Sequence, residues 1–357
     1  MRFAIAAAGT GGHVIPAIAV ADEIVAIGAN RSDILFLGGR RMAEKMVPAA
    51  GYPFLGFELT KLRRSASMEN LRIPAVVRRA ASAMADEIRR HEAVAVLGMS
   101  GYVTVPAVMA ARRAGIPFFL QEQNARPGLA SRYAARRSEV TFLGLPGPAE
   151  VLPRSEVVGN PLRPAVSRLN RSKLRAAARD DYGVAGAGPV LGILGGSLGA
   201  RVLNEAAPRL VAGSGAGGVI HLTGSAAFAE VSRRAAGSSV PWRCIAFEEE
   251  MERFYAAVDV VVSRAGALTV SELAATGTPA VLVPLARVGQ HHNASFLGRS
   301  GAAEIVAEGD SGTLPRVVAG MIGDERRLAA MSQRGRVVAL PDAAATIARR
   351  LVAVARG

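Results

Sequence analysis

Cysteine is almost absent from this 357-residue sequence: Cys244 is the single example, so no disulfide can form within the chain. We therefore expect a reducing compartment and interpret Cys244 as a small buried apolar residue. Aromatic residues are also scarce, at 5% of the sequence. This content argues against the stacking platforms that hold single-stranded nucleic acid, so no nucleic-acid partner is expected. Half of the residues are hydrophobic, which excludes a disordered chain.

Lysine is rare as well. Three lysines accompany 40 arginines among the 43 basic residues, and the formal net charge is +14. This charge favours an anionic partner, although an excess of arginine over lysine also follows from the nucleotide composition of a genome. A non-enzymatic protein that binds nucleic acid or another anionic surface is therefore an alternative. Under that alternative the glycine-rich turns described below have no role.

Long uninterrupted apolar runs are missing too. Residues 93–111 are uncharged, but Gly98 and Pro106 interrupt them, so we interpret this stretch as a strand, a turn and a helix. The apolar stretch within residues 1–8 is too short for the core of a signal peptide before glycines interrupt it. We therefore expect the chain to stay in the cytosol.

What the sequence has instead is a regular alternation of short apolar runs with helix-length segments. A chain of 357 residues is expected to form two domains. Continuous apolar strands between helices indicate parallel sheets covered on both faces, so the predicted fold class is α/β. The predicted strands are residues 3–7, 33–38, 93–98, 117–120, 156–159, 190–194, 218–222, 258–263 and 279–284.

A proline-containing junction divides the two predicted domains. The strand at residues 156–159 ends the first series and is followed by Pro161 and Pro164. We therefore place the domains at residues 1–160 and 161–341. The final helical stretch, residues 342–357, is a candidate to pack back on the first domain.

Three glycine-rich turns each follow a predicted strand and open a helical segment. They are residues 8–13 (AGTGGH), which precede a predicted helix at 14–26, residues 98–102 (GMSGY) and residues 195–199 (GGSLG). Glycines bring backbone N–H groups close to a ligand at the positive end of a helix. Ligands of parallel α/β sheets bind at the carboxyl ends of the strands. The turns therefore predict phosphate-binding loops in both domains, meeting at a cleft.

Two common nucleotide-binding motifs do not fit these turns. Val14 stands where the dinucleotide fingerprint needs a glycine, no acidic residue ends the second strand at 37–40, and no Gly-Lys-Ser/Thr occurs. Residues 195–199 do match the G-x-S-x-G nucleophile elbow, and Asp259 and His291 follow in the order of a hydrolase triad. An α/β-hydrolase with Ser197 as its nucleophile therefore stays open as an alternative.

Seven segments carry a resemblance to a known enzyme family. They are GTGGHVIPAIAVA (9–21), GYVTVPAVMAA (101–111), EQNARPGLASR (122–132), VVGNPLR (157–163), GGSLGARVLN (195–204), SRAGALTVSELAATGTPAVLVP (263–284) and GQHHNA (289–294). Together they resemble the MurG family of N-acetylglucosaminyltransferases, which convert lipid I to lipid II in peptidoglycan synthesis. The resemblance implies a GT-B fold, in which two Rossmann-like domains with parallel sheets face each other across a cleft.

The resemblance also implies an activity and partners. The activity is an inverting transfer of N-acetylglucosamine from UDP-GlcNAc to the 4-hydroxyl of the muramyl sugar of lipid I. The implied partners are UDP-GlcNAc in the second domain, lipid I beside the first, and an anionic phospholipid surface. The protein would be peripheral, at the cytoplasmic face of the cell membrane. Another GT-B enzyme that glycosylates a different lipid is an alternative, because the sequence motifs of its nucleotide pocket would be similar.

The matching motifs imply site residues. Those implied to bind UDP-GlcNAc are Thr10, Gly11, Gly12, Asn124, Arg163, Ser197, Glu248, Arg264, Ala267, Leu268, Thr269, Val270, Ser271, Glu272, Gln290 and Asn293. Those implied on the acceptor side are Ser100, Gly101 and Tyr102. Within the first set, Glu272 is implied to accept hydrogen bonds from the ribose hydroxyls and Ser197 to hold the diphosphate.

Four positions depart from the family pattern. Ala8 and Ser100 stand where the family has glycines, and Gln121 replaces a histidine. All three are expected to affect the acceptor side. Glu248 replaces an apolar residue that is implied to touch the uracil through its backbone.

The sequence contains no Asp-x-Asp, the motif with which many nucleotide-sugar transferases hold a metal. We therefore expect catalysis without a metal or another cofactor, with helix N-termini and Arg264 or Arg163 stabilising the departing diphosphate. His13 is the candidate base for the acceptor hydroxyl, and Glu122 is the second candidate. The alternative for His13 is a helix-capping or substrate-positioning role.

Residues 71–90 form a basic amphipathic pattern, with apolar residues on one helical stripe and arginines around it. Such a helix can lie on anionic lipid. The residues interpreted as membrane contacts are Val76, Val77, Arg78, Arg79 and Met84, with Lys61, Arg63 and Arg64 as neighbours. The alternative is a stripe that faces the protein core, with solvated arginines.

Overall fold

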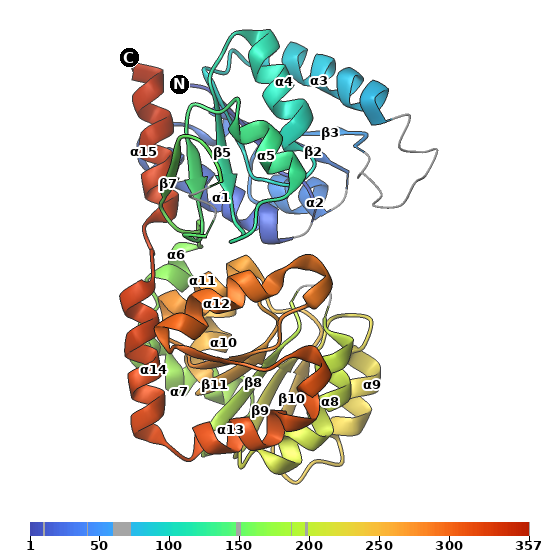
Figure 1. Ribbon diagram of the computed structural model, residues 1–357, viewed down its shortest axis with the longest axis vertical. Coiled ribbons are helices and arrows are strands. Elements are labelled where there is room, and N and C mark those ends of the chain that lie inside the picture. Colours follow the sequence, from blue (N-terminus) through green and yellow to red (C-terminus); the bar gives the residue numbers. More distant parts are fainter. Residues whose placement is uncertain are drawn as a thin grey trace. The chain divides into compact units, whose positions relative to one another are not determined.

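The chain forms two compact units in the computed structural model, which describes residues 1–9, 11–40, 42–59, 73–147, 151–186, 188–196 and 199–356. The first unit comprises residues 1–163 together with residues 341–357, and the second comprises residues 164–340 (Figure 1). The polypeptide therefore passes between the units twice. The first passage follows Arg163, which lies within the proline-containing junction and three residues beyond the predicted boundary at residue 160.

The first unit is built on a sheet of seven parallel strands in the order β3-β2-β1-β4-β5-β6-β7. The strands are β1 (Phe3–Ala6), β2 (Ile34–Gly39), β3 (Phe54–Phe57), β4 (Ala95–Gly98), β5 (Phe118–Glu122), β6 (Thr141–Leu143) and β7 (Ser155–Val157). In β1, Phe3 and Ile5 belong to one apolar cluster and Ala4 and Ala6 to another. Because successive side chains of a strand point to opposite faces, the sheet is covered on both sides.

Helices provide that cover. They are α1 (Gly11–Ala26), α2 (Met42–Ala49), α3 (Ile73–Arg90), α4 (Thr104–Ala114), α5 (Leu129–Ala135) and α15 (Ala343–Arg356), with a 3-10 helix η1 (Arg31–Asp33). The cluster on one face joins β1 to α1, α2 and α15, where Ile347 and Leu351 are buried. The cluster on the other face holds Met84 and Ile88 of α3 with residues of α4 and α5. The C-terminal helix is thus part of the core of the first unit.

The second unit has a sheet of six parallel strands in the order β10-β9-β8-β11-β12-β13. The strands are β8 (Val190–Leu194), β9 (Gly218–Leu222), β10 (Trp242–Ile245), β11 (Val260–Ser263), β12 (Ala280–Leu282) and β13 (Ala303–Ile305). Its helices are α6 (Pro164–Ser167), α7 (Arg171–Asp181), α8 (Arg201–Gly213), α9 (Phe228–Ala235), α10 (Met251–Ala257), α11 (Ala267–Thr276), α12 (Gln290–Ser300), α13 (Leu314–Ile322) and α14 (Glu325–Val338), with 3-10 helices η3 (Ala286–Val288) and η4 (Glu308–Thr313). Leu191 and Ile193 of β8 pack in one core with α8 and α13.

The prediction of an α/β fold with a parallel sheet in each half is confirmed. Every strand that the sequence predicted is present, with its ends shifted by a few residues at most. The structure adds β3, β6, β10 and β13, of which β3, β10 and β13 lie at sheet edges. These edge strands are only partly buried, so they lack the continuous apolar runs by which the inner strands are recognised.

The strand order reverses beside β1 in the first sheet and beside β8 in the second. β1 pairs with β2 on one side and β4 on the other, while β8 pairs with β9 and β11. Ligands of such sheets bind at the carboxyl ends of the strands where the order reverses. The glycine-rich turns after β1, β4 and β8 fall at these two positions, together with the turn that follows β11.

Candidate functional site

The turn after β11 leads directly into the motif from Ala267 to Glu272, which forms the first turns of α11. Gly266 is the N-cap residue and is extended, with φ −63° and ψ 143°. The first amides of a helix have no partner within it and carry a partial positive charge. The start of α11 therefore lies at the carboxyl end of β11. Its first residues are Ala267, Leu268, Thr269, Val270 and Ser271.

Glu272 is an almost buried carboxylate, with 8% of its surface exposed. Its Oε2 accepts a hydrogen bond of 2.9 Å from the hydroxyl of Tyr255, a fully buried residue of α10. This bond fixes the orientation of the carboxylate. The sequence analysis missed Tyr255, because nothing in the sequence links a tyrosine on one helix to a glutamate two elements later.

The side chain of Arg264 is held at the carboxyl ends of β11 and β12. Its Nη1 donates to the Val283 carbonyl oxygen at 3.1 Å, and its Nη2 forms an ion pair of 2.5 Å with Oε1 of Glu308 in η4. The side chain of Arg264 is 13% exposed. Glu308, 44 residues further along the chain, is a second partner that the sequence did not indicate. The guanidinium is therefore placed before any ligand binds.

Two amide side chains of α12 hold the neighbouring turns. Asn293 is 2% exposed and donates to the Ala265 carbonyl oxygen at 3.1 Å. Gln290 accepts a hydrogen bond of 2.9 Å from the backbone N–H of Leu285. The structure therefore brings Gln290 and Asn293 to the same sheet edge as Arg264. Both amides support the backbone there, in addition to the sugar contacts implied for them.

The glycine-rich turn after β8 brings two backbone segments into close contact. A Cβ at Gly199 would collide with the carbonyl oxygen of Thr223, and Gly199 has a φ of +75°. Only glycine fits this position without a shift of the backbone. Ser197, the residue implied to hold the diphosphate, lies outside the described residues.

Glu248 uses both carboxylate oxygens within the protein. Its Oε2 accepts from the hydroxyl of Tyr182 at 2.7 Å, and its Oε1 accepts from the backbone N–H of Glu250 at 2.9 Å. Burial and then this carboxylate raise the pKa of Tyr182. The acidic side chain that departs from the family pattern is thus satisfied by its own neighbours.

In the first unit, His13 lies in the first turn of α1, beside two glycines. Its Nε2 is 3.5 Å from where a Cβ on Gly101 would be, and its Nδ1 is 3.8 Å from where a Cβ on Gly9 would be. The imidazole therefore lies between the turns that follow β1 and β4. Gly11 and Gly12 open the same helix, whereas Thr10 lies outside the described residues.

Tyr102 and Ser100 follow β4 at the same sheet edge. The hydroxyl oxygen of Tyr102 is 2.9 Å from where a Cβ on Gly39 would be, at the end of β2. Ser100 is 2% exposed and has a φ of +48°, a left-handed conformation that favours glycine. This backbone conformation explains why a glycine suits this position in the family.

Glu122 ends β5 and is 1% exposed. Its Oε1 accepts from the backbone N–H of Asn124 at 2.8 Å and from the Asn124 side-chain amide at 3.2 Å. Burial raises the pKa of Glu122, and its hydrogen bonds with Ser131 and Asn124 oppose that rise. The structure thus joins Glu122 to Asn124 and keeps both near the end of β5.

Gln121 is fully buried, and its Nε2 donates to Oδ1 of Asn160 at 3.0 Å. The side chain therefore belongs to the interior of the unit, and the effect of this departure on the acceptor side stays a prediction. Arg163, implied to reach the donor, is the last residue of the first segment of this unit.

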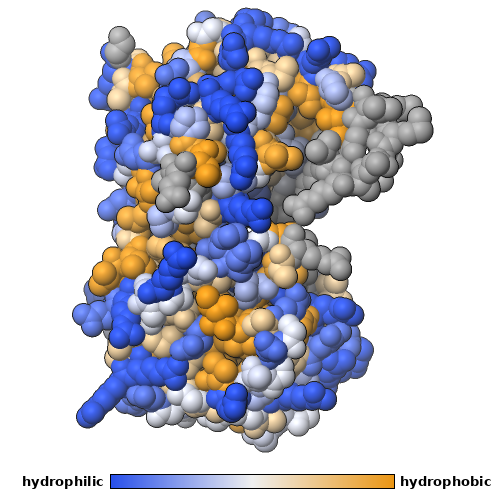
Figure 2. All heavy atoms as spheres, viewed as in Figure 1, coloured by the Kyte–Doolittle hydropathy of each residue, from blue (hydrophilic) through white to orange (hydrophobic). Residues whose placement is uncertain are grey.

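The amphipathic helix α3 has one face in the protein core and another face exposed. Met84 is fully buried in the core with Ala80 and Ile88, so the prediction that Met84 contacts a membrane is wrong. Val76 and Val77 are partly buried, and Arg78 and Arg79 are exposed. Figure 2 shows hydrophilic side chains along the outer border of the region of α3 and α4. Lys61, Arg63 and Arg64 lie outside the described residues.

None of the helices in the described part of the chain combines the length and the apolar character needed to cross a bilayer.

The hydrolase alternative fails on geometry. Asp259 precedes β11 and so lies at the amino end of the strand, whereas His291 is in the first turn of α12 at the carboxyl side. The four residues of β11 separate the two ends by about 13 Å. Asp259 is also engaged by Arg175 and Arg179. A triad with Asp259 as its acid therefore cannot form.

The histidine pair at the start of α12 does not resemble a metal site. The rings of His291 and His292 lie against each other, with centroids 3.8 Å apart. Across the described ranges, no three histidine, cysteine or acidic side chains gather in a group that could hold a metal ion.

Comparison with known proteins gives the family. Residues 3–142 match the model of the glycosyltransferase family 28 N-terminal domain, and residues 190–347 match that of the glycosyltransferase family 28 C-terminal domain. The chain belongs to glycosyltransferase family 28. The first match lies within the first unit, and the second covers most of the second unit and ends in α15 of the first.

Family-28 relatives cover the chain almost completely. A protein of Halorhodospira halophila named UDP-N-acetylglucosamine--N-acetylmuramyl-(pentapeptide) pyrophosphoryl-undecaprenol N-acetylglucosamine transferase is 40% identical, over 99% of this chain and 98% of the relative. A protein of the same name from Mycobacterium tuberculosis is 38% identical, over 99% of this chain and 89% of the relative.

Solved structures agree with the fold. The crystal structure of Acinetobacter baumannii MurG has a TM-score of 0.76 and 27% sequence identity, and the match covers 99% of this chain and all of that one. UDP-GlcNAc 2-epimerase of Neisseria meningitidis, solved with UDP-GlcNAc bound, has a TM-score of 0.70 at 14% identity over 99% of this chain and 100% of that one. At that identity the likeness concerns the fold alone.

Proposed function

We propose that this family-28 protein transfers N-acetylglucosamine from UDP-GlcNAc to the 4-hydroxyl of the muramyl sugar of lipid I, which gives lipid II. The observation that carries the proposal is the convergence of Arg264, the start of α11 and Glu272 beside the point where the second sheet reverses its strand order. The names of relatives 38% and 40% identical over 99% of the chain support the choice of donor and acceptor.

In this proposal the second unit binds the donor. Glu272 accepts hydrogen bonds from the ribose diol, for which a carboxylate oriented by Tyr255 is well suited. The first amides of α11 and the turn after β8 receive the diphosphate. Gln290 and Asn293, with Asn124 and Arg163 from the first unit, contact the sugar end of the donor.

The first unit binds the acceptor and supplies the base. The acceptor oxygen attacks the anomeric carbon of N-acetylglucosamine while the bond from that carbon to UDP breaks, so the configuration inverts in one step. UDP leaves with the electron pair, and His13 takes the proton of the hydroxyl. Gly101 lies beside His13, and with Ser100 and Tyr102 of the same turn it would line the acceptor side. Glu122 is the alternative base, since its raised pKa brings it closer to neutral pH.

No metal is required in this scheme. Helix N-termini are each worth about 0.3–1 kcal/mol to an anion at an exposed site, and more where the site is partly buried. Arg264 adds a full charge, but Glu308 already neutralises part of it. The amides of α11 and the turn after β8 therefore carry a large share of the charge that develops on UDP.

We also propose that the protein is peripheral, at the cytoplasmic face of the membrane that carries the lipid-linked acceptor. The exposed Arg78 and Arg79 of α3, with Val76 and Val77 beside them, would meet an anionic phospholipid surface. Charge reversal at Arg78 and Arg79 should reduce binding to anionic vesicles and leave UDP binding unchanged. Unaltered vesicle binding would contradict this assignment.

The activity is tested with UDP-GlcNAc, a lipid I analogue and a chelator. We expect UDP release and formation of the disaccharide product with and without the chelator, and little turnover with UDP-glucose. The Arg316→Gln variant changes one exposed charge on α13 away from the site. It is the control for variants of the site residues and should be fully active. Product formation only with another acceptor lipid would replace this proposal with the related lipid glycosyltransferase.

A further inference from the structure

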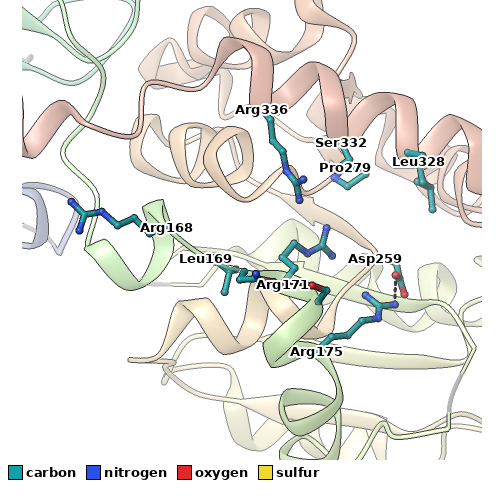
Figure 3. A pocket seen from close by; sticks show the side chains of 12 residues that line it. Arg168, Leu169, Arg171, Arg175, Asp259, Pro279, Leu328, Ser332 and Arg336 are labelled. Atoms are coloured by element: carbon teal, nitrogen blue, oxygen red, sulfur yellow. Dashed lines mark hydrogen bonds and ion pairs between the residues drawn. The ribbon is translucent and has the colours of Figure 1, made fainter.

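The second unit contains a cavity of about 720 Å³ at the edge of the sheet opposite the candidate nucleotide site. Asp259 and Pro279, which line it, directly precede β11 and β12 and so mark the amino ends of these strands. The cavity is closed on one side by the start of α7 and on another by α14 (Figure 3). It is therefore separated from Arg264 by the length of β11, about 13 Å.

The lining of this cavity carries an excess of positive charge. It includes Arg168, Arg171, Arg175 and Arg336 but a single carboxylate, Asp259. The two oxygens of that carboxylate are already engaged. Oδ1 pairs with Arg175 at 2.5 Å, and Oδ2 pairs with Arg179 at 2.6 Å and accepts from the backbone N–H of Val190 at 2.8 Å. Asp259 therefore has little capacity left for the other arginines.

Arg171 is fixed in place by backbone carbonyls. Its Nη2 donates to the carbonyl oxygen of Val258, the residue that follows α10. Its Nη1 donates to the carbonyl oxygen of Gly277, the residue that follows α11, at 3.5 Å. Its Nε is buried and has no hydrogen-bond partner among the described residues. Burial, followed by the neighbouring Arg175, lowers the pKa of Arg171 to about 10, so the guanidinium remains charged at neutral pH.

Arg336 approaches the same position from α14. A Cβ on Gly277 would lie 2.5 Å from the Nε of Arg336, so this side chain packs directly over the glycine whose carbonyl holds Arg171. Figure 3 shows the side chains of Arg171 and Arg336 pointing toward each other. Within the described ranges the guanidinium of Arg336 has no carboxylate within ion-pair distance. Two like charges thus lie close together, and the single carboxylate of the lining, Asp259, also acts on Arg171 but is already paired with Arg175 and Arg179.

We propose that this cavity binds a small molecule that carries phosphoryl groups, at a site separate from that of the sugar nucleotide. Paired guanidinium groups beside the first amides of α7, at Arg171 and Ser172, suit the several oxygens of a phosphoryl group. The volume lies within the range of about 300–1,000 Å³ that is typical of small-molecule sites, which leaves room for more than a phosphate ion. Occupancy would add negative charge to a lining in which one carboxylate stands against four arginines.

Inorganic pyrophosphate titrated into the full-length protein tests this site by calorimetry, with saturating UDP to occupy the nucleotide site. We expect binding that weakens with salt. Arg336→Gln should reduce the affinity about tenfold or more, because the exposed Arg336 would contact the ligand and no hydrogen bond or ion pair of its side chain is recorded among the described residues. Arg171→Gln should do the same. Arg326→Gln, which removes an exposed charge from the same helix outside the cavity, should bind pyrophosphate as the wild type does.

Several outcomes would overturn the proposal. They are an absence of pyrophosphate binding to the wild type, equal binding by the Arg336→Gln variant, and equal affinity for citrate, which carries carboxylates without phosphoryl groups. Arg171 also supports the ends of two helices, so its variant can lose stability. In that case the Arg336→Gln variant decides the result, since among the described residues this side chain packs on Gly277 but makes no recorded hydrogen bond or ion pair.

Discussion

The carboxyl edges of the two sheets are built in different ways. In the second unit, the charged and amide side chains are tied to the protein: Glu272 to Tyr255, Arg264 to Glu308 and to a backbone carbonyl. In the first unit, Glu122 and Asn124 are joined to each other, and His13 and Tyr102 lie against glycine backbone. The donor groups are thus held by partners from other elements, which preorganises them for the nucleotide, whereas the groups proposed for the acceptor lie at glycine-rich turns. Nucleotide affinity should therefore depend on the second unit and the rate of transfer on the first.

The largest effect should come from His13→Ala. If His13 removes the acceptor proton, kcat should fall by about 10²–10⁴-fold. Because His13 belongs to the first unit, the Kd for UDP, measured by calorimetry, should stay unchanged. Near-normal turnover would exclude the base role, and a parallel loss of UDP binding would break the division of tasks between the units.

Glu272→Gln should have the opposite profile. Hydrogen bonds to a charged group are worth about 1.5–3 kcal/mol, so UDP should bind roughly tenfold to a hundredfold more weakly. The value of kcat at saturating donor should change much less. Tyr255→Phe is the matched control, since it removes the orienting hydroxyl but keeps the carboxylate, and it should weaken UDP binding by a smaller factor. Unchanged affinity in Glu272→Gln would show that the ribose lies elsewhere.

Glu122→Gln should change how stability depends on pH. Burial raises the pKa of Glu122 in the folded state above 4.5. The protonated carboxyl therefore stabilises the fold at low pH, and this contribution is lost as the pH rises through the folded-state pKa. Urea unfolding at a series of pH values should show the variant gaining stability relative to the wild type with increasing pH.

The exposed Glu58 provides the control for that series. Glu58→Gln shows what the removal of an exposed carboxylate alone does to the same series. A constant difference between wild type and Glu122→Gln would mean that the carboxyl is not desolvated in the folded state.

Ser100→Gly should give the smallest effect. A left-handed residue other than glycine costs about 1–2 kcal/mol, and glycine loses about 0.5–1 kcal/mol through its flexibility. The variant should therefore be more stable to urea by up to about 1 kcal/mol. Ser100→Ala keeps the Cβ and should show no such gain. A gain of equal size in both variants would attribute the effect to the hydroxyl and not to the backbone.

Local sequence patterns predicted the inner strands and the glycine-rich turns because both depend on consecutive residues. The turns at residues 8–13 and 195–199 carry their own signal, and the parallel sheets place them at the points where the strand order reverses. Pairings between distant elements gave no signal of this kind. The bonds of Tyr255 with Glu272 and of Glu308 with Arg264 depend on which strands become neighbours.

The same limit applies to burial. The stripe of α3 was predicted from its period, but whether Met84 faces the core or the solvent is decided by the packing of α3 on α4 and the sheet. Gln121 is a second example. It is next to the candidate catalytic residue Glu122 in the sequence, but successive residues of a strand point to opposite faces. Its side chain therefore bonds to Asn160 inside the protein.

The return of α15 to the first unit has a consequence for biosynthesis. Ile347 and Leu351 complete an apolar layer whose other members range from Phe3 to Val158. That layer stays incomplete until α15 has been synthesised, which happens after the whole of residues 164–340. The second unit, which is continuous in sequence, can therefore complete its fold before the first, although most of the first unit is synthesised earlier.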